Sequence, residues 1–262
     1  MRLNGKWLGV LLLLAAVFMP GCSFMNKLQA RNNLNKGGKA FTDRKYAAAA
    51  QFFEKAVKLD PDLLEARIYL ATAYTSQFVP GSTDPESEAN AHKAIDIFKQ
   101  VVDLAKGKSE EKKNAMLSIA SLYYQLKQYP ESKEWCIKIH SEFPDTAEAY
   151  YRIAVMDFDE VIENTGLQGE NVEYMTPEEK EKAQANIEEG LQNLDEALKL
   201  RKNYFDAMEY QNLLWREKAK FEQDEEKKAE ILRQADMVSR KALALKLKAE
   251  EEEAKKPKKL GL

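Results

Sequence analysis

The chain has few of the residues from which catalytic and metal sites are usually built. Its 262 residues include two Cys and two His, and His92 and His140 lie far apart in the sequence. There is no HExxH zinc motif, GxSxG nucleophile motif or GxGxxG dinucleotide motif. Gly107-Lys108-Ser109 matches the end of a phosphate-binding loop, but the Gly required five residues earlier is Val102. We therefore expect no enzymatic activity, no metal and no cofactor.

Glycine and proline are also scarce, with 11 Gly and 8 Pro. The chain is 44% hydrophobic and 32% charged, and it is rich in Ala, Glu, Lys and Leu, a profile typical of helical proteins and not of sheets. The net charge is −3, and it becomes −5 without the N-terminal cations Arg2 and Lys6. No basic stripe is present, so we expect no binding to nucleic acid.

The first 22 residues have the pattern of an export signal. Arg2 and Lys6 form a charged start, residues 8–18 form an apolar run, and Gly21-Cys22 follows. The apolar run is shorter than the about 20 residues that a membrane-spanning helix needs.

The stretch Tyr46–Pro61 predicts the packing of the rest of the chain. At helical spacing, Tyr46, Ala49, Phe53 and Ala56 share one face. The two alanines allow a second helix to approach closely, and the two rings fill the space beside that crossing. Pro61 cannot continue the helix, so the chain is expected to turn back there.

This pattern recurs along the chain. Small residues of a preceding helix repeat at a spacing of 34, from Gly37 to Ala71 and again from Ala120 to Ala154. The stripe recurs as Tyr129, Ser132, Cys136, Ile139 and Pro144, and in weaker form as Ala94, Phe98 and Val101; Gly190, Leu194 and Ala197; and Ala235, Ser239 and Ala242. These copies predict five helix pairs.

The repeat resembles the tetratricopeptide repeat, a helix–turn–helix unit of 34 residues. The resemblance implies an all-α solenoid of about five helix pairs over residues 31–248, followed by a charged tail at 249–262. Inserts at about 76–90, 164–177 and 223–226 fall at the turn inside a pair, so stacking should place them along one rim. Thr176-Pro177-Glu178-Glu179 predicts a helix start.

Gly21-Cys22 resembles the end of a bacterial lipoprotein signal. This resemblance implies that residues 1–21 are removed, that Cys22 is acylated (for example with palmitate), and that residues 22–30 tether the solenoid. Met19 and Pro20 depart from the Leu and small residue usual there. Ser23 is similar to the residue that sorts such proteins to an outer membrane facing the periplasm. The alternative is an ordinary signal or uncleaved anchor in which Cys22 is incidental.

Cys136 and His140 lie four residues apart on one helix and could meet as a metal pair or an activated thiol. However, Cys136 takes the position that Phe53 takes in the first pair. A buried, inert thiol is therefore the interpretation that the repeat favours.

The first helix of each pair, the leading helix, lines the concave side of such a solenoid. Residues there that do not pack on the second helix of the pair are candidates for partner binding. Aromatic and Arg residues are frequent in binding hot spots. The strongest candidates are Phe41, Tyr69, Tyr124, Tyr151, Arg152 and Phe158. Further candidates are Leu34, Ile68, Thr72, Leu117, Gln125, Val155, Leu213 and Arg216.

Among these we favour the surface of pairs three and four, around Tyr151, and expect its side chains to contribute little to folding. The alternative is that the next repeat buries these residues, or that they are ordinary surface.

Together these features predict a lipid-anchored adaptor of the bacterial cell envelope that binds protein partners, in the assembly of an envelope complex. A pilotin-like role in pilus or secretion assembly is equally compatible with the residues. A structural spacer is a further alternative, as is an enzyme with an unrecognised site near 164–177.

Overall fold

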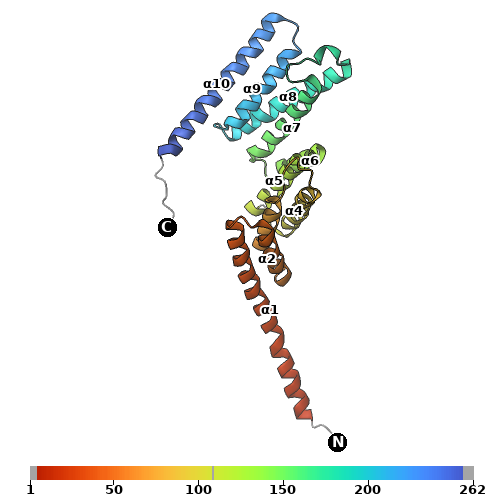
Figure 1. Ribbon diagram of the computed structural model, residues 1–262, viewed down its shortest axis with the longest axis vertical. Coiled ribbons are helices and arrows are strands. Elements are labelled where there is room, and N and C mark those ends of the chain that lie inside the picture. Colours follow the sequence, from red (N-terminus) through yellow and green to blue (C-terminus); the bar gives the residue numbers. More distant parts are fainter. Residues whose placement is uncertain (1–4, 108, 256–262) are drawn as a thin grey trace. The chain divides into compact units, whose positions relative to one another are not determined.

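The computed structural model describes the backbone of residues 5–107 and 109–255 and the side chains of residues 23–107, 109–252, 254 and 255. This part of the chain is helical, without a strand (Figure 1). Its α-helices are α1 (Gly5–Thr42), α2 (Tyr46–Leu59), α3 (Leu64–Thr75), α4 (Pro85–Leu104), α5 (Glu110–Gln125), α6 (Tyr129–Glu142), α7 (Ala147–Thr165), α8 (Pro177–Leu200), α9 (Phe205–Lys220) and α10 (Glu225–Lys255). A short 3-10 helix, η1 (Val172–Tyr174), lies between α7 and α8.

Four of the predicted pairs, α1–α2, α3–α4, α7–α8 and α9–α10, pack helix against helix. The helices of the predicted third pair, α5 and α6, follow one another in sequence. The all-α, tetratricopeptide-type arrangement of helix pairs is confirmed. The longer connections, 76–84 and 166–176, fall inside the second and fourth pairs, and 221–224 falls inside the fifth. The inserts therefore lie where the repeat predicts, at the turn inside a pair.

The chain divides into two compact units, residues 1–128 (unit 1) and residues 129–262 (unit 2). The division falls between α5 and α6, which the sequence predicts as one clean third pair. Unit 1 therefore contains two complete pairs and α5, and unit 2 contains α6 and two complete pairs.

One core cluster of unit 1 is built on the predicted stripe. Ala49, Phe53 and Ala56 of α2 are fully buried, and they pack with Leu34 and Leu70 of the leading helices α1 and α3. Gly37 lies at the crossing of α1 and α2, where a Cβ would come within 2.4 Å of the Phe53 ring. Close approach of these two helices therefore requires the absence of a side chain at position 37.

In unit 2 the helices α7, α8, α9 and α10 lie side by side (Figure 1). Its core joins buried residues of α7, α8 and α9, including Ala154, Leu194 and Leu214. Gly190 of α8 takes the place of Ala49, and a Cβ there would lie 2.6 Å from a methyl group of Leu214. The small residues of the repeat thus mark close helix crossings in both units.

The predicted start of α8 is confirmed. The Thr176 hydroxyl accepts a hydrogen bond from the Glu179 N–H, and the Glu179 carboxylate accepts one from the Thr176 N–H. Pro177 occupies the first helical position, where a missing N–H costs nothing. This capping box ends the 166–176 insert at a fixed residue.

The two ends of the predicted solenoid continue as helix. Residues 23–30, within the expected tether, belong to α1, and their larger apolar side chains Phe24, Met25 and Leu28 are exposed. At the other end α10 continues to Lys255, into the expected tail at 249–262. Residues 256–262 lie outside the described part.

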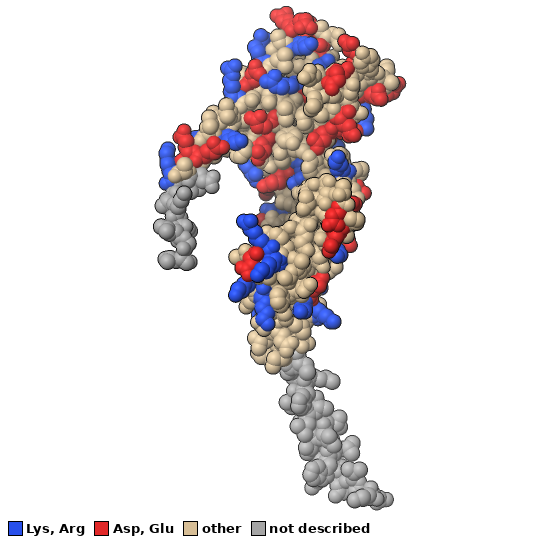
Figure 2. Space-filling view, viewed as in Figure 1, with Lys and Arg blue, Asp and Glu red and all other residues tan. Residues whose placement is uncertain are grey.

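Acidic and basic side chains are interspersed on the face of the molecule shown in Figure 2.

Candidate functional site

A pocket of about 350 Å³ opens in unit 1 on the leading helices. It brings together three sequence-predicted residues, Leu34 and Phe41 of α1 and Tyr69 of α3. The remaining lining residues are Asn35, Gly38, Thr42, Phe53 and Glu65. Glu65 carries the only charged side chain in this lining, and polar and apolar groups contribute about equally to the pocket surface.

Ring packing fixes the walls of this unit 1 pocket. Tyr69 is 43% exposed, and its ring stacks on that of the buried Phe53, with 5.6 Å between ring centroids and 20° between ring planes. Phe41 packs edge-on against Tyr46 at 5.1 Å. The aromatic surface is thus held by the core and does not have to be ordered when a ligand binds.

The rings of unit 2 that the sequence also predicts as binding residues are packed together. Tyr151 and Phe158 of α7 each contact the ring of Tyr210 of α9 in a T-shaped arrangement, with centroids 5.5 Å apart. Tyr151 also lies 5.1 Å from the ring of Tyr204. Burial raises the pKa of the Tyr151 hydroxyl well above its ordinary value, and it raises that of Tyr204 to about 12.

These four rings, Tyr151, Phe158, Tyr204 and Tyr210, form what we call the unit 2 aromatic cluster. It packs on the core of unit 2. Tyr151 and Phe158 thus lie between successive leading helices, which contradicts the premise that their side chains are not needed between helices. Their contribution to folding stays a prediction. Val155, a further predicted binding residue, is 5% exposed and belongs to the core.

The other predicted binding residues are spread over the two units. Tyr124 of α5 is half-buried, as is Arg152 of α7. The charge of Arg152 lies close enough to Cys136 and Tyr204 to lower their pKa values against the larger effect of burial. Arg216 is exposed and pairs with Asp236 of α10 at 2.6 Å. Of the remaining predicted residues, Gln125 is exposed, and Ile68, Thr72, Leu117 and Leu213 are half-buried.

Cys136 is fully buried, as its position in the repeat predicts. Burial raises the pKa of its thiol to about 12, so the reactive thiolate is scarce at neutral pH. The ring of His140 stacks on Tyr150 at 3.9 Å, and burial lowers its pKa. The prediction that the Cys136 thiol is buried is confirmed. In the described residues no group of three or more His, Cys, Asp or Glu side chains could hold a metal ion.

Sequence reasoning missed a buried polar group in unit 2. Asp157 of α7 is 3% exposed, and its Oδ1 lies 3.3 Å from Nζ of Lys133 of α6. The same Nζ lies 2.8 Å from Oε1 of Glu189 of α8. Burial raises the pKa of Asp157 from 3.8 to about 7, although the charge of Lys133 opposes the shift. Burial lowers the pKa of Lys133, but its bonds to Glu189 and Asp157 raise it above its ordinary value.

The signal for Asp157 was present in the repeat. The corresponding positions of the first three pairs hold Ala40, Tyr74 and Tyr123. A carboxylate at a position that packs between helices is costly unless it has partners. An Asp there therefore indicates either a buried ion pair or a site.

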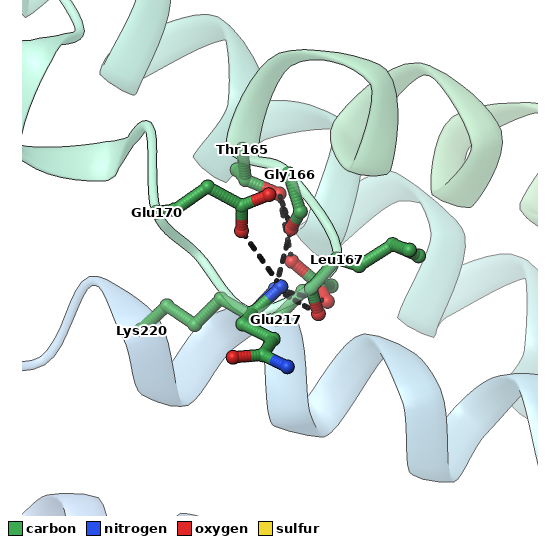
Figure 3. Close-up of polar contacts among 7 residues, drawn as sticks. Thr165, Gly166, Leu167, Glu170, Glu217 and Lys220 are labelled. Carbon is green, nitrogen blue, oxygen red and sulfur yellow. Dashed lines mark hydrogen bonds and ion pairs between the residues drawn. The ribbon is translucent and has the colours of Figure 1, made fainter.

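A second buried carboxylate in unit 2, Glu217 of α9, fastens the 166–176 insert (Figure 3). Its Oε2 accepts a hydrogen bond of 3.0 Å from the Thr165 hydroxyl, and its Oε1 pairs with Nζ of Lys220 at 2.7 Å. Lys220 also donates to the Gly166 carbonyl at 3.1 Å. Gly166 has a φ of 78°, which a residue with a Cβ adopts only under strain. The start of the insert is thus held on α9.

The insert and the connection 221–224 line one pocket of about 490 Å³ in unit 2. Gln168, Val172 and Glu173 come from the insert, and Glu222 and Gln223 from the connection. Within unit 2 the inserts therefore do lie on one side, as stacked pairs predict. The lining mixes cations and carboxylates and has no single chemical character.

The side chain of Cys22, the predicted lipidation site, lies outside the described residues. Among the residues that the structure does describe, no helix is both long enough and apolar enough to cross a bilayer.

No protein-family model and no curated protein matches the sequence. Solved structures do match. The chain is similar to the crystal structure of the MamA protein, with a TM-score of 0.55 and 16% identity over 89% of this chain and 97% of that one. A second crystal structure of MamA gives a TM-score of 0.54 at 15% identity, covering 82% and 96% of the two chains. MamA residues 41-end from Desulfovibrio magneticus RS-1 give 0.53 at 13%, covering 81% and 96%. At these identities the likeness shows the fold, a series of tetratricopeptide-type helix pairs.

Proposed function

We propose that this chain is a protein-binding scaffold and that the unit 1 pocket receives an apolar side chain of its partner. The observation that carries this proposal is the pocket itself, with Phe41 and Tyr69 at its walls and Phe53 beneath. Its volume, about 350 Å³, is at the lower end of the range for ligand sites, which suits one or two side chains better than a cofactor.

The fold supports this proposal through the position of the pocket. Its residues come from the leading helices α1 and α3, with Phe53 of α2 beneath them. Preformed aromatic walls are typical of interface positions where truncation costs at least about 2 kcal/mol of binding.

We also propose that the scaffold is attached to a membrane of the bacterial cell envelope through lipid on Cys22, with an outer membrane facing the periplasm favoured, and that it acts in the assembly of an envelope complex. The motive is the sequence alone: a charged start, a short apolar run, and Gly21-Cys22. Cys22→Ala should abolish labelling by a fatty-acid probe and release the protein from membranes, whereas undiminished labelling would exclude Cys22. Because a single acyl chain anchors weakly, more than one chain is expected there.

The partner site is tested by photocrosslinking in intact cells from position 69. The pocket is blocked with Gly38→Leu, since a Cβ at Gly38 meets no atom within 4 Å and the residue lines the pocket. Lys36→Leu is the matched control, because Lys36 is exposed and lies about 200° around the helix from Gly38.

We expect a crosslinked partner that is lost with Gly38→Leu and kept with Lys36→Leu. If both variants keep the crosslink, or if position 69 yields none, the unit 1 pocket is not the partner site.

A further inference from the structure

Two buried carboxylates in unit 2 differ in one respect. Both oxygens of Glu217 are paired, one with Lys220 and one with Thr165. Asp157 pairs only through Oδ1, and its buried Oδ2 has no hydrogen-bond partner among the described residues. A purely structural role explains Glu217 fully. The same role does not explain Oδ2 of Asp157, because burying a carboxylate oxygen without a hydrogen-bond partner costs free energy.

Asp157 also lines a pocket of about 370 Å³ between α6 and α7. Tyr129, Pro130 and Lys133 line it from α6, and Met156, Glu160 and Glu163 line it from α7. The pocket thus combines a buried carboxylate with apolar and aromatic walls. Such a combination matches a ligand that carries a cation at the end of an aliphatic stem.

The charges around the pocket favour a cation. The pocket is lined by three carboxylates and by one amine, that of Lys133. This amine is already paired with Asp157 and Glu189. Glu160 pairs with Lys182 at 2.5 Å, and Glu163 is exposed. Glu163 lies in the last turn of α7, which has no basic residue although the dipole of a helix favours cations there.

We propose that this α6–α7 pocket binds a lysine or arginine side chain of a protein segment, with the cation directed at the Asp157 carboxylate and the stem against Met156 and Pro130. The inference rests on the proposed function, since it assigns a second contact to a protein-binding scaffold. A bound cation would pair the free oxygen and favour the ionised carboxylate, which burial otherwise disfavours.

The test uses the full chain in detergent with ¹³C-methyl-labelled methionine, because Met156 reports directly from the pocket wall. Its methyl signal is followed during titration with acetyl-Ala-Ala-Lys-Ala-Ala-amide. The same peptide with Arg, and a neutral peptide with norleucine in place of Lys, are titrated in parallel. Butylamine is the probe for a free amine.

We expect a saturable shift with the Lys or Arg peptide, and an apparent affinity at least about tenfold lower for the norleucine peptide and for butylamine. Asp157→Asn should weaken binding of the basic peptide at least about tenfold. Glu163→Gln, at an exposed position, should weaken it about two- to fivefold, as for a surface ion pair. Glu181→Gln, an exposed carboxylate outside the pocket, is the matched control and should bind as the parent does.

Equal binding of the norleucine peptide, or unchanged binding by Asp157→Asn, would overturn the proposal. Butylamine binding as tightly as the peptide would show a site for free amines and not for a protein segment. If Asp157→Asn does not fold, the norleucine comparison and Glu163→Gln still decide. The outcome is separable from the crosslinking test, because these peptides report on unit 2 and the Gly38→Leu variant reports on unit 1.

Discussion

Aromatic side chains on leading helices have opposite surroundings in the two units. In unit 1, Phe41 and Tyr69 border an open pocket. In unit 2, the rings of Tyr151 and Phe158 on α7 are covered by Tyr210 of α9. The difference lies in which helix supplies the contacting rings. Tyr210 belongs to the next leading helix, whereas Phe41 and Tyr69 contact the rings of Tyr46 and Phe53 on the second helix of the first pair. A residue on a leading helix is available to a partner only where the following leading helix does not cover it.

The largest expected effect is on the floor of the unit 1 pocket. Phe53 is fully buried, and its ring supports Tyr69. Phe53→Ala should therefore reduce the free energy of unfolding by about 3–5 kcal/mol. Denaturant melts measure this change. Tyr69→Ala is the control and should cost less, since 43% of that residue is exposed. An equal loss of unfolding free energy in the two variants would contradict the role of Phe53 as the buried support of the pocket.

The comparison between units is tested next in the unit 2 aromatic cluster. Tyr151→Ala combined with Phe158→Ala should reduce the free energy of unfolding by about 2–4 kcal/mol, because both rings pack on the core and contact Tyr210. Thermal melts of the single and double variants provide the measurement. An unchanged melting temperature would restore the original expectation that these side chains are free for a partner.

A pH-dependent effect should distinguish Asp157 from its counterpart in the first pair, Ala40. The pKa of Asp157 is raised from 3.8 to about 7, so the folded chain keeps a proton that the unfolded chain releases. Stability should therefore fall as the pH rises from about 4 to about 7 and then level off. Asp157→Asn should remove this loss and be about 3–4 kcal/mol more stable relative to the parent at pH 8 than at pH 4.

Denaturant melts at pH 4, 6 and 8 measure the difference between parent and Asn variant. A constant difference across these values would show that Asp157 titrates normally and that its charge is well solvated.

The smallest effects come from two neighbouring glycines of α1. Gly37→Ala should cost about 1–3 kcal/mol, because its Cβ would overlap the ring of Phe53. Gly38→Ala should instead raise the free energy of unfolding by about 0.5–1 kcal/mol, because a Cβ there has no atom within 4 Å and Ala favours a helix. Melts of both variants on one scale test the helix crossing. Changes of the same sign would contradict the packing described here.

Local residue patterns predicted the elements that pack within one repeat. The spacing of Ala49, Phe53 and Ala56 was enough to place them in a core, because small and large residues on one stripe determine a helix crossing. The predicted caps and inserts also depend on neighbouring residues, and they are found where expected.

Contacts between residues far apart in sequence could not be predicted in the same way. Tyr151 meets Tyr210, about 60 positions further on, and no pattern around Tyr151 shows that ring. The division of the chain between α5 and α6 is likewise a property of packing between repeats. Asp157 was visible as an exception in the repeat, but its partners Lys133 and Glu189 come from two other helices.

Because α1 is one continuous helix, it fixes the axial distance between residues along it. Gly38 follows Cys22 on the same helix by about four and a half turns, or about 24 Å of axial rise. If Cys22 carries the proposed lipid, that length is the greatest distance that this part of α1 can place between the lipidated residue and the unit 1 pocket. Each residue inserted between them would move the pocket by about 1.5 Å along the helix axis and turn it by about 100° about that axis. Seven added residues, close to two full turns, would move the pocket along the helix axis and leave the direction in which it faces nearly unchanged.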